Sequence, residues 1–278
     1  MEQEDISNYT KVCVTGGSGY IGSWLVKKLL QKGYTVHATL RNLDEKPKVE
    51  LLRSLPNADT RLVLFQADIY NPTEFEPAIR SRYMFFMYNT SEAAIASARI
   101  IANSCVRSQT VKWLIYTASV MSSSPLKEDG SGYKPSFNES SWTSLNLSYT
   151  LSNDVFLAYI KSKTLAEKEV SSYNEIEYSK LEVVKLLGSV PLLHIDDVCE
   201  AHIFCMEKKS LRGRFLCSAV DPTIQEIFIF RLVGGPKRGS SCDSTKLMEM
   251  GFQYKYDMKK ILDDSVDTGF RLGALPLN

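Results

Sequence analysis

The sequence lacks the features of membrane-bound, secreted and nucleic-acid-binding proteins. No apolar run is long enough to cross a bilayer, and the first ten residues, MEQEDISNYT, contain no apolar stretch such as a signal peptide needs. The 33 basic residues nearly balance the 32 acidic ones, and no basic run or basic amphipathic helix stands out. We therefore expect a cytoplasmic protein that binds neither membranes nor nucleic acids.

Cysteines are few and dispersed, which argues against a disulfide framework. No two of them form a CxxC pair, and most lie within apolar runs. We expect buried free thiols, because a free cysteine behaves as a small apolar residue. The six cysteines are Cys13, Cys105, Cys199, Cys205, Cys217 and Cys242.

Short apolar runs alternate with helical patterns, which predicts βαβ units and a doubly wound α/β fold with a parallel sheet. The main domain is predicted over 10–206, and a small, shortened C-terminal lobe over 207–278. The polar stretch 122–153 is too long for an ordinary connection and is predicted to be an active-site loop. Predicted strands are 11–15, 34–40, 61–65, 84–88, 111–117, 181–187 and 213–217; predicted helices are 23–31, 48–54, 74–80, 93–106, 154–173, one opening at Asp196, and 259–271.

A glycine-rich turn, VTGGSGYIGSWL, joins the first predicted strand to the first predicted helix. Gly16, Gly19 and Gly22 allow a tight bend, close approach of the main chain to a pyrophosphate, and close helix–strand packing. The phosphates would meet the positive end of the helix, with Tyr20 and Ile21 in its first turn. Because a strand precedes the turn and a second strand follows the helix, we prefer a dinucleotide-binding Rossmann fold to a simple turn.

The end of the second predicted strand indicates which dinucleotide is bound. Sites for NAD usually have an acidic residue there, whereas this chain has Arg41, with Lys48 on the next helix. Both cations would attract a 2′-phosphate; the alternative is that Arg41 is simply solvated. Asp68 and Ile69, after the third strand, are placed to contact the adenine. NADP(H) is the predicted cofactor.

Tyr159 and Lys163 stand four residues apart on a predicted helix and so share one face. A neighbouring ammonium favours the phenolate, which lowers the tyrosine pKa from its ordinary value of about 10. Ser119, at the end of the fifth strand, can hydrogen-bond a substrate carbonyl. These three residues form the predicted catalytic group, although the serines at 122–124 are alternatives to Ser119. Tyr159 and Lys163 are also predicted to bind the cofactor, because the lysine can hydrogen-bond the nicotinamide ribose.

The cluster HIDDVCEAH could suggest a metal site, but its spacing matches neither a compact zinc site nor a di-metal site. Asp196 is instead predicted to cap a helix. The apolar face of that helix would be Val198, Ala201, Ile203 and Cys205. We therefore predict no metal.

Together these residues resemble the plant dihydroflavonol 4-reductase, anthocyanidin reductase and vestitone reductase group of extended short-chain dehydrogenases/reductases. The resemblance implies NADPH and a flavonoid or related phenolic carbonyl substrate, with hydride transfer to the carbonyl, Tyr159 as proton donor, Lys163 as its pKa modulator and Ser119 orienting the substrate. The matching segments are VTGGSGYIGSWLVKKLLQKGYTVHATLRN, IYTAS, YIKSKTLAEKE, HIDDVCEAHIF, GRFLCS, STKL and GFQYKYDM.

The chain also departs from that group at three places, where it is shorter. These are the segment FFMYNTSEAAIAS, the passage from LEVV to KLLGSVPLLHIDDV, and IFIFRLVGGPKRG. Much of the substrate lid is therefore expected to be missing. One alternative function is a weak or inactive NADP(H)-binding truncated isoform. Another is a sugar-nucleotide epimerase or dehydratase, which Arg41 disfavours. A monomer or weak dimer is expected.

Overall fold

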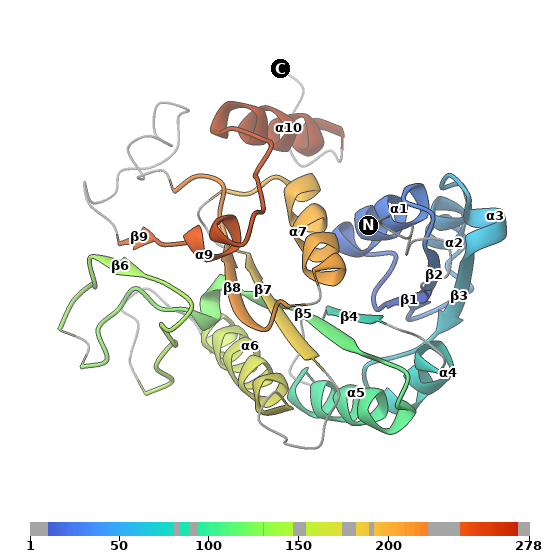
Figure 1. Cartoon of the computed structure of the whole chain (residues 1–278), viewed down its shortest axis with the longest axis horizontal. Helices are drawn as coiled ribbons and strands as arrows, with labels where there is room; N and C mark the ends of the chain where they lie inside the picture. Colours follow the sequence, from blue (N-terminus) through green and yellow to red (C-terminus); the bar gives the residue numbers. More distant parts are fainter. Residues whose placement is uncertain are drawn as a thin grey trace, which may run out of the picture.

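Seven parallel strands form the central sheet, in the order β3-β2-β1-β4-β5-β7-β8 (Figure 1). The computed structural model describes residues 11–80, 84–88, 94–129, 131–146, 154–173, 182–188, 192–208, 210–221 and 240–271. The strands of the sheet are β1 (Lys11–Val14), β2 (Thr35–Leu40), β3 (Leu62–Gln66), β4 (Met84–Tyr88), β5 (Trp113–Ser119), β7 (Glu182–Gly188) and β8 (Gly213–Cys217).

Helices cover both faces of this sheet, as the alternating pattern predicts. In Figure 1, α1 and α7 lie on one face, and α5 and α6 on the other. The helical elements are α1 (Tyr20–Gln31), α2 (Lys46–Arg53), α3 (Ala58–Arg61), η2 (Pro72–Phe75), α4 (Glu76–Ile79), α5 (Ala94–Ser108), η3 (Val120–Ser122), α6 (Asp154–Ser172), α7 (Ile195–Glu207), α9 (Thr245–Glu249) and α10 (Met258–Arg271).

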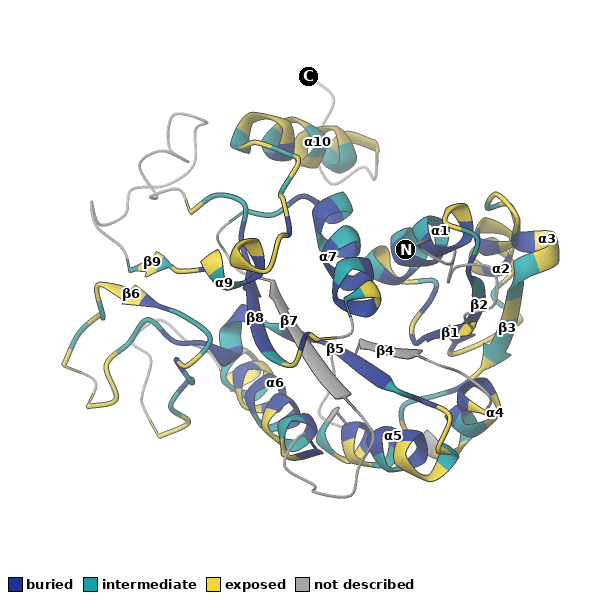
Figure 2. Cartoon of the chain, viewed as in Figure 1, coloured by how far each residue is buried: buried dark blue, intermediate teal, exposed yellow. Residues whose placement is uncertain are grey.

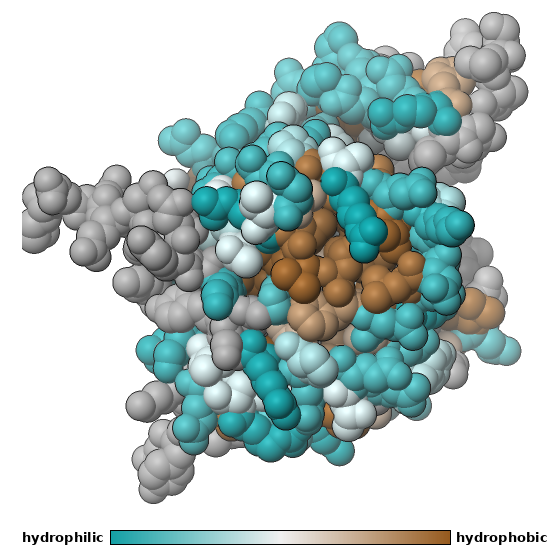
Figure 3. Space-filling model, turned by 90° about the vertical axis from the view of Figure 1, so that its right-hand side faces the viewer, coloured by the Kyte–Doolittle hydropathy of each residue, from teal (hydrophilic) through white to brown (hydrophobic). Residues whose placement is uncertain are grey.

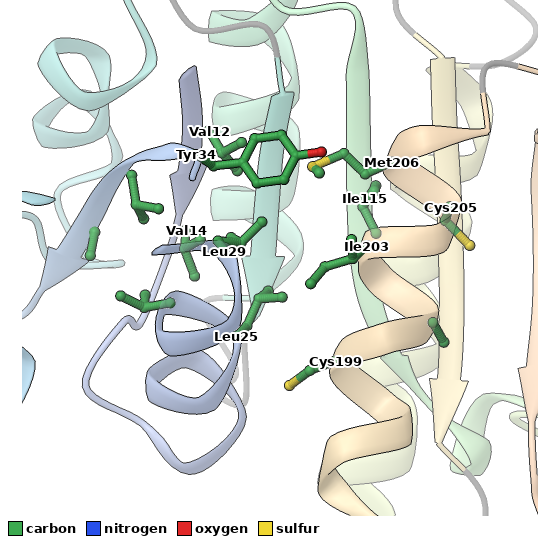
Figure 4. Packing of buried hydrophobic residues seen from close by; sticks show 14 of the residues in the cluster. Val12, Val14, Leu25, Leu29, Tyr34, Ile115, Cys199, Ile203, Cys205 and Met206 are labelled. Atoms are coloured by element: carbon green, nitrogen blue, oxygen red, sulfur yellow. The ribbon is translucent and has the colours of Figure 1, made fainter. Parts of the chain in front are cut away.

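Helix α1 shows why these helices dock on the sheet. Its buried residues recur at helical spacing and form one apolar stripe: Gly22, Leu25, Val26, Leu29 and Leu30. Figure 4 shows Leu25 and Leu29 between the side chains of β1 and those of α7. Each fully buried leucine contributes roughly 1.5–3 kcal/mol to the free energy of unfolding. The helix then stops before Gly33, whose φ of 85° suits glycine.

A second apolar core lies under α5 and α6 on the opposite face. The sheet-facing sides of both helices are buried and their outer sides exposed (Figure 2). Small residues such as Ala98, Ala102 and Ala166 are fully buried there, so the helices can approach the strands closely. This face carries the helix with Tyr159 and Lys163.

At the edge of the sheet, β3 leaves apolar side chains exposed. Val63 is 44% exposed, and Leu43, Val49, Leu62 and Leu64 line a groove of about 560 Å³ with it. Figure 3 shows this apolar surface at the centre of the face that holds α2, α3 and β3. An apolar sheet edge is a surface at which another strand can pair.

Two local predictions need correction. The single helix predicted over 74–80 is instead the 3₁₀ turn η2 followed by the short α4. Pro72 and Pro77 stand at the starts of these pieces, because a proline lacks the N–H that a continuous helix requires. Asp196 does not cap α7: the cap is His194, whose side chain accepts a hydrogen bond from the Asp196 N–H.

The chain after 206 adds to the main sheet as well as to a smaller one. Strand β8 pairs with β7, and Phe215 and Leu247 belong to the core under α1 and α7. The short strands β6 (Ser136–Phe137) and β9 (Ser241–Cys242) pair in parallel and join the loop after β5 to the C-terminal part. The division between 10–206 and 207–278 stays a prediction.

Candidate active site

The glycine turn bends back on β2 directly after β1. Gly17 donates its N–H to the Thr39 carbonyl at 2.9 Å, and Gly16 adopts a φ of 61°, in the left-handed region. A Cβ on Gly22 would lie 2.2 Å from the Gly16 carbonyl oxygen, so only glycine fits there. A Cβ on Gly16 would have no atom within 4 Å, so this side of the turn is open.

The open turn leads into the N-terminus of α1. Gly19 is the N-cap of α1, and it has no side chain that could accept a hydrogen bond from the first turn. Tyr20 and Ile21 begin the helix. The first N–H groups of a helix have no intrahelical acceptors, and the helix dipole adds positive potential at this end. The open glycine backbone and these N–H groups therefore fit the pyrophosphate of a dinucleotide.

Arg41 immediately follows β2, with its side chain 76% exposed and its Nε 3.8 Å from Asp68 Oδ2. Lys48, in the first turn of α2, pairs with Glu45 and is also exposed. Exposed ion pairs contribute only about 0–1 kcal/mol, so a phosphate can compete for both cations. Asp68 therefore lies beside Arg41, whereas the partner of Lys48 is Glu45, the N-cap of the same helix.

Asp68 and Ile69 lie in the turn after β3 and are fixed by neighbouring polar groups. Asp68 donates its backbone N–H to Glu74 at 2.8 Å, and the Ile69 carbonyl accepts from Ser97 Oγ of α5 at 2.8 Å. The Asp68 carboxylate itself accepts the Tyr70 N–H at 2.9 Å and stays partly exposed beside Arg41. The turn is thus held in place at the carboxyl end of the sheet.

Tyr159 and Lys163 face each other on α6. The Lys163 Nζ lies 5.8 Å from the centroid of the Tyr159 ring, a distance at which a cation attracts an aromatic face. Tyr159 is 37% exposed, whereas Lys163 is 2% exposed. Burial lowers the pKa of Lys163 to about 8, because the charged ammonium loses hydration. The pair thus combines an accessible hydroxyl with a buried, easily deprotonated amine.

Ser119 ends β5, and α6 packs against both β5 and the following η3. Its Oγ accepts the Met121 N–H at 3.2 Å, which leaves its own O–H able to donate. The neighbouring serines are less accessible: Ser122, Ser123 and Ser124 are 0%, 4% and 5% exposed, and Ser123 Oγ also accepts from Arg214 at 2.9 Å, whereas Ser119 is partly exposed. This arrangement favours Ser119 among the four serines.

A buried ion pair between α6 and β8 was not predicted from the sequence. Arg214 Nε of β8 lies 2.5 Å from Glu167 Oε1 of α6, and both side chains are buried. The only local signal was that Glu167 continues the face of Tyr159 and Lys163 at four-residue intervals.

A groove of about 620 Å³ adjoins the start of α1, a size suited to a small molecule. Its apolar walls include Ile21, Trp24, Leu193, Ile195, Val198 and Ile261. Tyr20 and Ile21 therefore line both this groove and the predicted pyrophosphate site.

The histidine–acid cluster beside the groove acts as a connector between helices. His194 Nε2 lies 3.0 Å from Asp264 of α10, and Asp196 accepts from Trp24 Nε1 of α1 at 3.0 Å. Asp197 accepts backbone N–H groups of Lys255 and Tyr256. Among the described residues, no group of three or more His, Cys, Asp or Glu side chains could hold a metal ion. No helix in those ranges is long and apolar enough to cross a membrane.

Comparisons with known proteins bear on the fold and the family. The sequence model of the GDP-mannose 4,6 dehydratase family matches residues 13–91. Dihydroflavonol 4-reductase of Callistephus chinensis is 30% identical, with 95% of this chain and 88% of that protein aligned. The crystal structure of alfalfa (Medicago sativa) vestitone reductase superposes with a TM-score of 0.76 at 28% identity, covering 95% of this chain and 99% of that one. Yeast methylglyoxal/isovaleraldehyde reductase Gre2, solved with NADPH, has the same fold at 18% identity, with a TM-score of 0.75 and coverage of 96% and 100%.

The alignment with the Callistephus protein also bears on the expected shortening. It extends over 324 positions, more than the 278 residues of this chain, so that protein has segments without a counterpart here. The first and third expected junctions fall wholly or partly at 89–93 and 222–239, outside the described residues, and the second passage, from 181 to 198, includes the strand β7 and the residues 189–191, which also lie outside them. Their positions stay predictions.

Proposed function

Because this chain belongs to the dihydroflavonol 4-reductase family, we propose that it is an NADPH-dependent reductase of a flavonoid or related phenolic carbonyl compound. The observation that carries the proposal is the pair of Tyr159 and Lys163 on α6, beside the strand that ends at Ser119. A partly exposed phenol, a buried amine and a serine hydroxyl near the carboxyl end of the sheet support this proposal, because open α/β sheets bind ligands there.

The chain's residues divide the binding of the cofactor among three regions. Gly16, Gly19 and Gly22, with the first N–H groups of α1, hold the pyrophosphate. Arg41 and Lys48 bind the 2′-phosphate, and the turn at 68–69 borders the adenine. When bound, NADPH supplies the hydride.

In the reduction, Tyr159 gives its phenolic proton to the substrate oxygen as negative charge develops there. Ser119 donates a hydrogen bond to the same oxygen and thereby orients the carbonyl. Lys163, in its charged form, stabilises the phenolate that Tyr159 becomes. The aromatic and aliphatic walls of the 620 Å³ groove next to Tyr20 suit part of a phenolic ring system.

Two other functions are less well supported. A binding protein with weak or no turnover accounts for the unmatched segments of the 324-position alignment, but not for the retained group of Ser119, Tyr159 and Lys163. A sugar-nucleotide dehydratase or epimerase is suggested by the family model over 13–91, yet that match covers only 79 of the 278 residues, in the part of the chain that begins with the glycine turn.

The test is to follow NADPH absorbance with a panel of dihydroflavonols, isoflavanones and anthocyanidins. We expect oxidation of NADPH with at least one of them, and loss of nearly all turnover in Tyr159→Phe with NADPH affinity kept. Tight NADPH binding without turnover on the whole panel would instead support the binding protein. Turnover of a sugar nucleotide would support the third function.

A further inference from the structure

Arg214 on β8 uses its complete set of hydrogen-bond donors inside the protein. A guanidinium has five N–H groups in a rigid planar arrangement. Here five oxygens lie opposite them: Glu167 Oε1 at 2.5 Å, the Glu139 carbonyl at 2.5 Å, the Ser141 and Ser122 carbonyls at 3.2 Å each, and Ser123 Oγ at 2.9 Å. The residue is only 6% exposed.

Four of these contacts join the two ends of the loop that follows β5. Ser122 and Ser123 stand where the loop begins, directly after Ser119 and η3, and Glu139 and Ser141 stand where it returns. Thr143 closes the same neck by donating its N–H to the Ser122 carbonyl at 3.0 Å. Arg214 therefore holds the neck of the loop closed.

The fifth contact ties this neck to the helix that carries the predicted proton donor. Glu167 is fully buried on α6, four residues beyond Lys163 and eight beyond Tyr159. Residues at these intervals lie along one face of a helix. One guanidinium thus connects the segment that starts at Ser119 with the face of α6 that presents Tyr159.

The flat face of the guanidinium is also fixed, because its Cζ lies 3.9 Å from the centroid of the Trp142 ring. Burying a charge pair loses hydration, and such pairs often add little to the free energy of unfolding. What a fully bonded, stacked arginine does supply is a defined orientation of the groups around it.

We propose that Arg214 is a positioning residue: it sets the position of Ser119 relative to Tyr159 and Lys163 by joining the neck of the 122–143 loop to α6. The inference rests on the proposed function, since it assigns those three residues to the reaction. Arg214 itself lies behind the site and touches neither substrate nor cofactor.

Arg214→Lys is the decisive variant. It keeps the positive charge and the apolar stem but has three donors on one nitrogen, which cannot reach five oxygens arranged around a fork. Arg214→Met removes the charge as well. The matched control is Arg99→Met, which deletes a bidentate pair with Glu169 on the same helix, at 2.7 and 2.9 Å, without touching the loop.

We expect Arg214→Lys to lower kcat by about 10- to 100-fold, because small displacements of reacting groups have effects of that size. The Kd for NADPH should stay within about twofold, since the glycine turn belongs to the other face of the sheet. Hydrogen exchange should accelerate in 120–143 and not in α1 or β2. Arg99→Met should leave kcat and exchange of 120–143 unchanged.

A merely structural role predicts a different result: lower thermal stability with unchanged kcat per folded molecule, which would overturn the proposal. Unchanged exchange of 120–143 in Arg214→Lys would overturn it equally. If Arg214→Met does not fold, the kcat and the hydrogen exchange of Arg214→Lys still test the proposal. If the wild-type chain turns over no carbonyl but exchange accelerates as expected, the connection stands and the proposed reaction is what fails.

Discussion

Lys163 is a buried cation whose protonation state changes within the pH range of ordinary assay buffers. Burial lowers its pKa from 10.5 to about 8, so the folded protein releases this proton before the unfolded chain does. Between those two pKa values the unfolded state binds more protons, and stability therefore rises with pH. Below pH 8 the full cost of burying the charge remains, about 3 kcal/mol for a shift of this size.

Lys163→Met should remove this pH dependence. We expect the wild-type chain without cofactor to gain stability between pH 8 and 10.5, and the variant to be more stable at pH 7 with no such gain. Urea unfolding at pH 7, 8.5 and 10 measures it. Turnover should depend on pH in the opposite direction. The kcat of the wild type should fall above about pH 8, because Lys163 loses the charge that stabilises the phenolate of Tyr159. A stability that declines over this pH range would contradict the assignment.

Arg41 should determine the preference for NADPH over NADH. In Arg41→Ala we expect the Kd for NADPH to rise about tenfold or more, because a charge-assisted contact to the 2′-phosphate is lost. The Kd for NADH should hardly change, because NADH has no 2′-phosphate for Arg41 to bind. Fluorescence titration of both cofactors measures this. Arg53→Ala, at the other end of α2, is the control; an equal loss for both cofactors in Arg41→Ala would argue against a phosphate contact.

At the scale of elements, α7 connects α1 with α10. His194 caps α7 by accepting the Asp196 N–H at Nδ1, so its Nε2 carries the proton that is shared with Asp264 of α10. The ring also lies 4.0 Å, between centroids, from Tyr256. The side chain of His194 thus caps α7 and also holds α10 beside the groove.

His194→Ala should loosen α10 before the rest of the molecule. We expect a loss of about 1–2 kcal/mol, the usual effect of removing an N-cap, and faster hydrogen exchange in 258–271. Denaturant midpoints and exchange by mass spectrometry check both. Lys259→Ala is a matched control, because Lys259 is 80% exposed and pairs only within α10, with Asp263. Uniformly faster exchange throughout the chain would contradict a local connection.

Most elements could be predicted because their signals are local. The strand at 84–88 and the helix at 154–173 follow from runs of apolar residues or helical spacing. The cap of α7 could not, because histidine accepts a backbone N–H only if its tautomer leaves Nδ1 unprotonated, and Asp264 of a distant helix selects that tautomer. The helical spacing over 74–80 predicts one helix, whereas Pro72 and Pro77 divide the stretch at 72–79 into two short pieces.

At the scale of the whole molecule, the candidate site gathers residues from the ends of parallel strands and from α6. The glycine turn and the spacing of Tyr159 and Lys163 were predictable because each lies within one short segment. Arg214 was not, since its partners stand 47 to 92 positions away in sequence. Contacts at such separations depend on the order of strands in the sheet, and no local pattern encodes them.

A shortened lid, as predicted from the sequence, should separate the binding of cofactor from that of substrate. The glycine turn and α1 are intact, so NADPH should bind with ordinary affinity. Covering segments supply much of a substrate's binding energy and exclude water, and relatives have segments that this chain lacks. We therefore expect a high KM and a low kcat on any flavonoid, together with a lowered Tm, because a lost cover leaves groove walls such as Trp24 and Leu193 partly exposed.

Grafting a relative's segment into the connection between Gly188 and His194 tests this expectation directly. The graft should lower KM and raise kcat and Tm while the Kd for NADPH stays constant, because only the cover over the groove changes. A glycine–serine insert of equal length is the control, since it adds chain without apolar surface. If the native chain already reduces a flavonoid efficiently and the graft improves nothing, the expectation of an impaired pocket is wrong and the shorter chain is a working design.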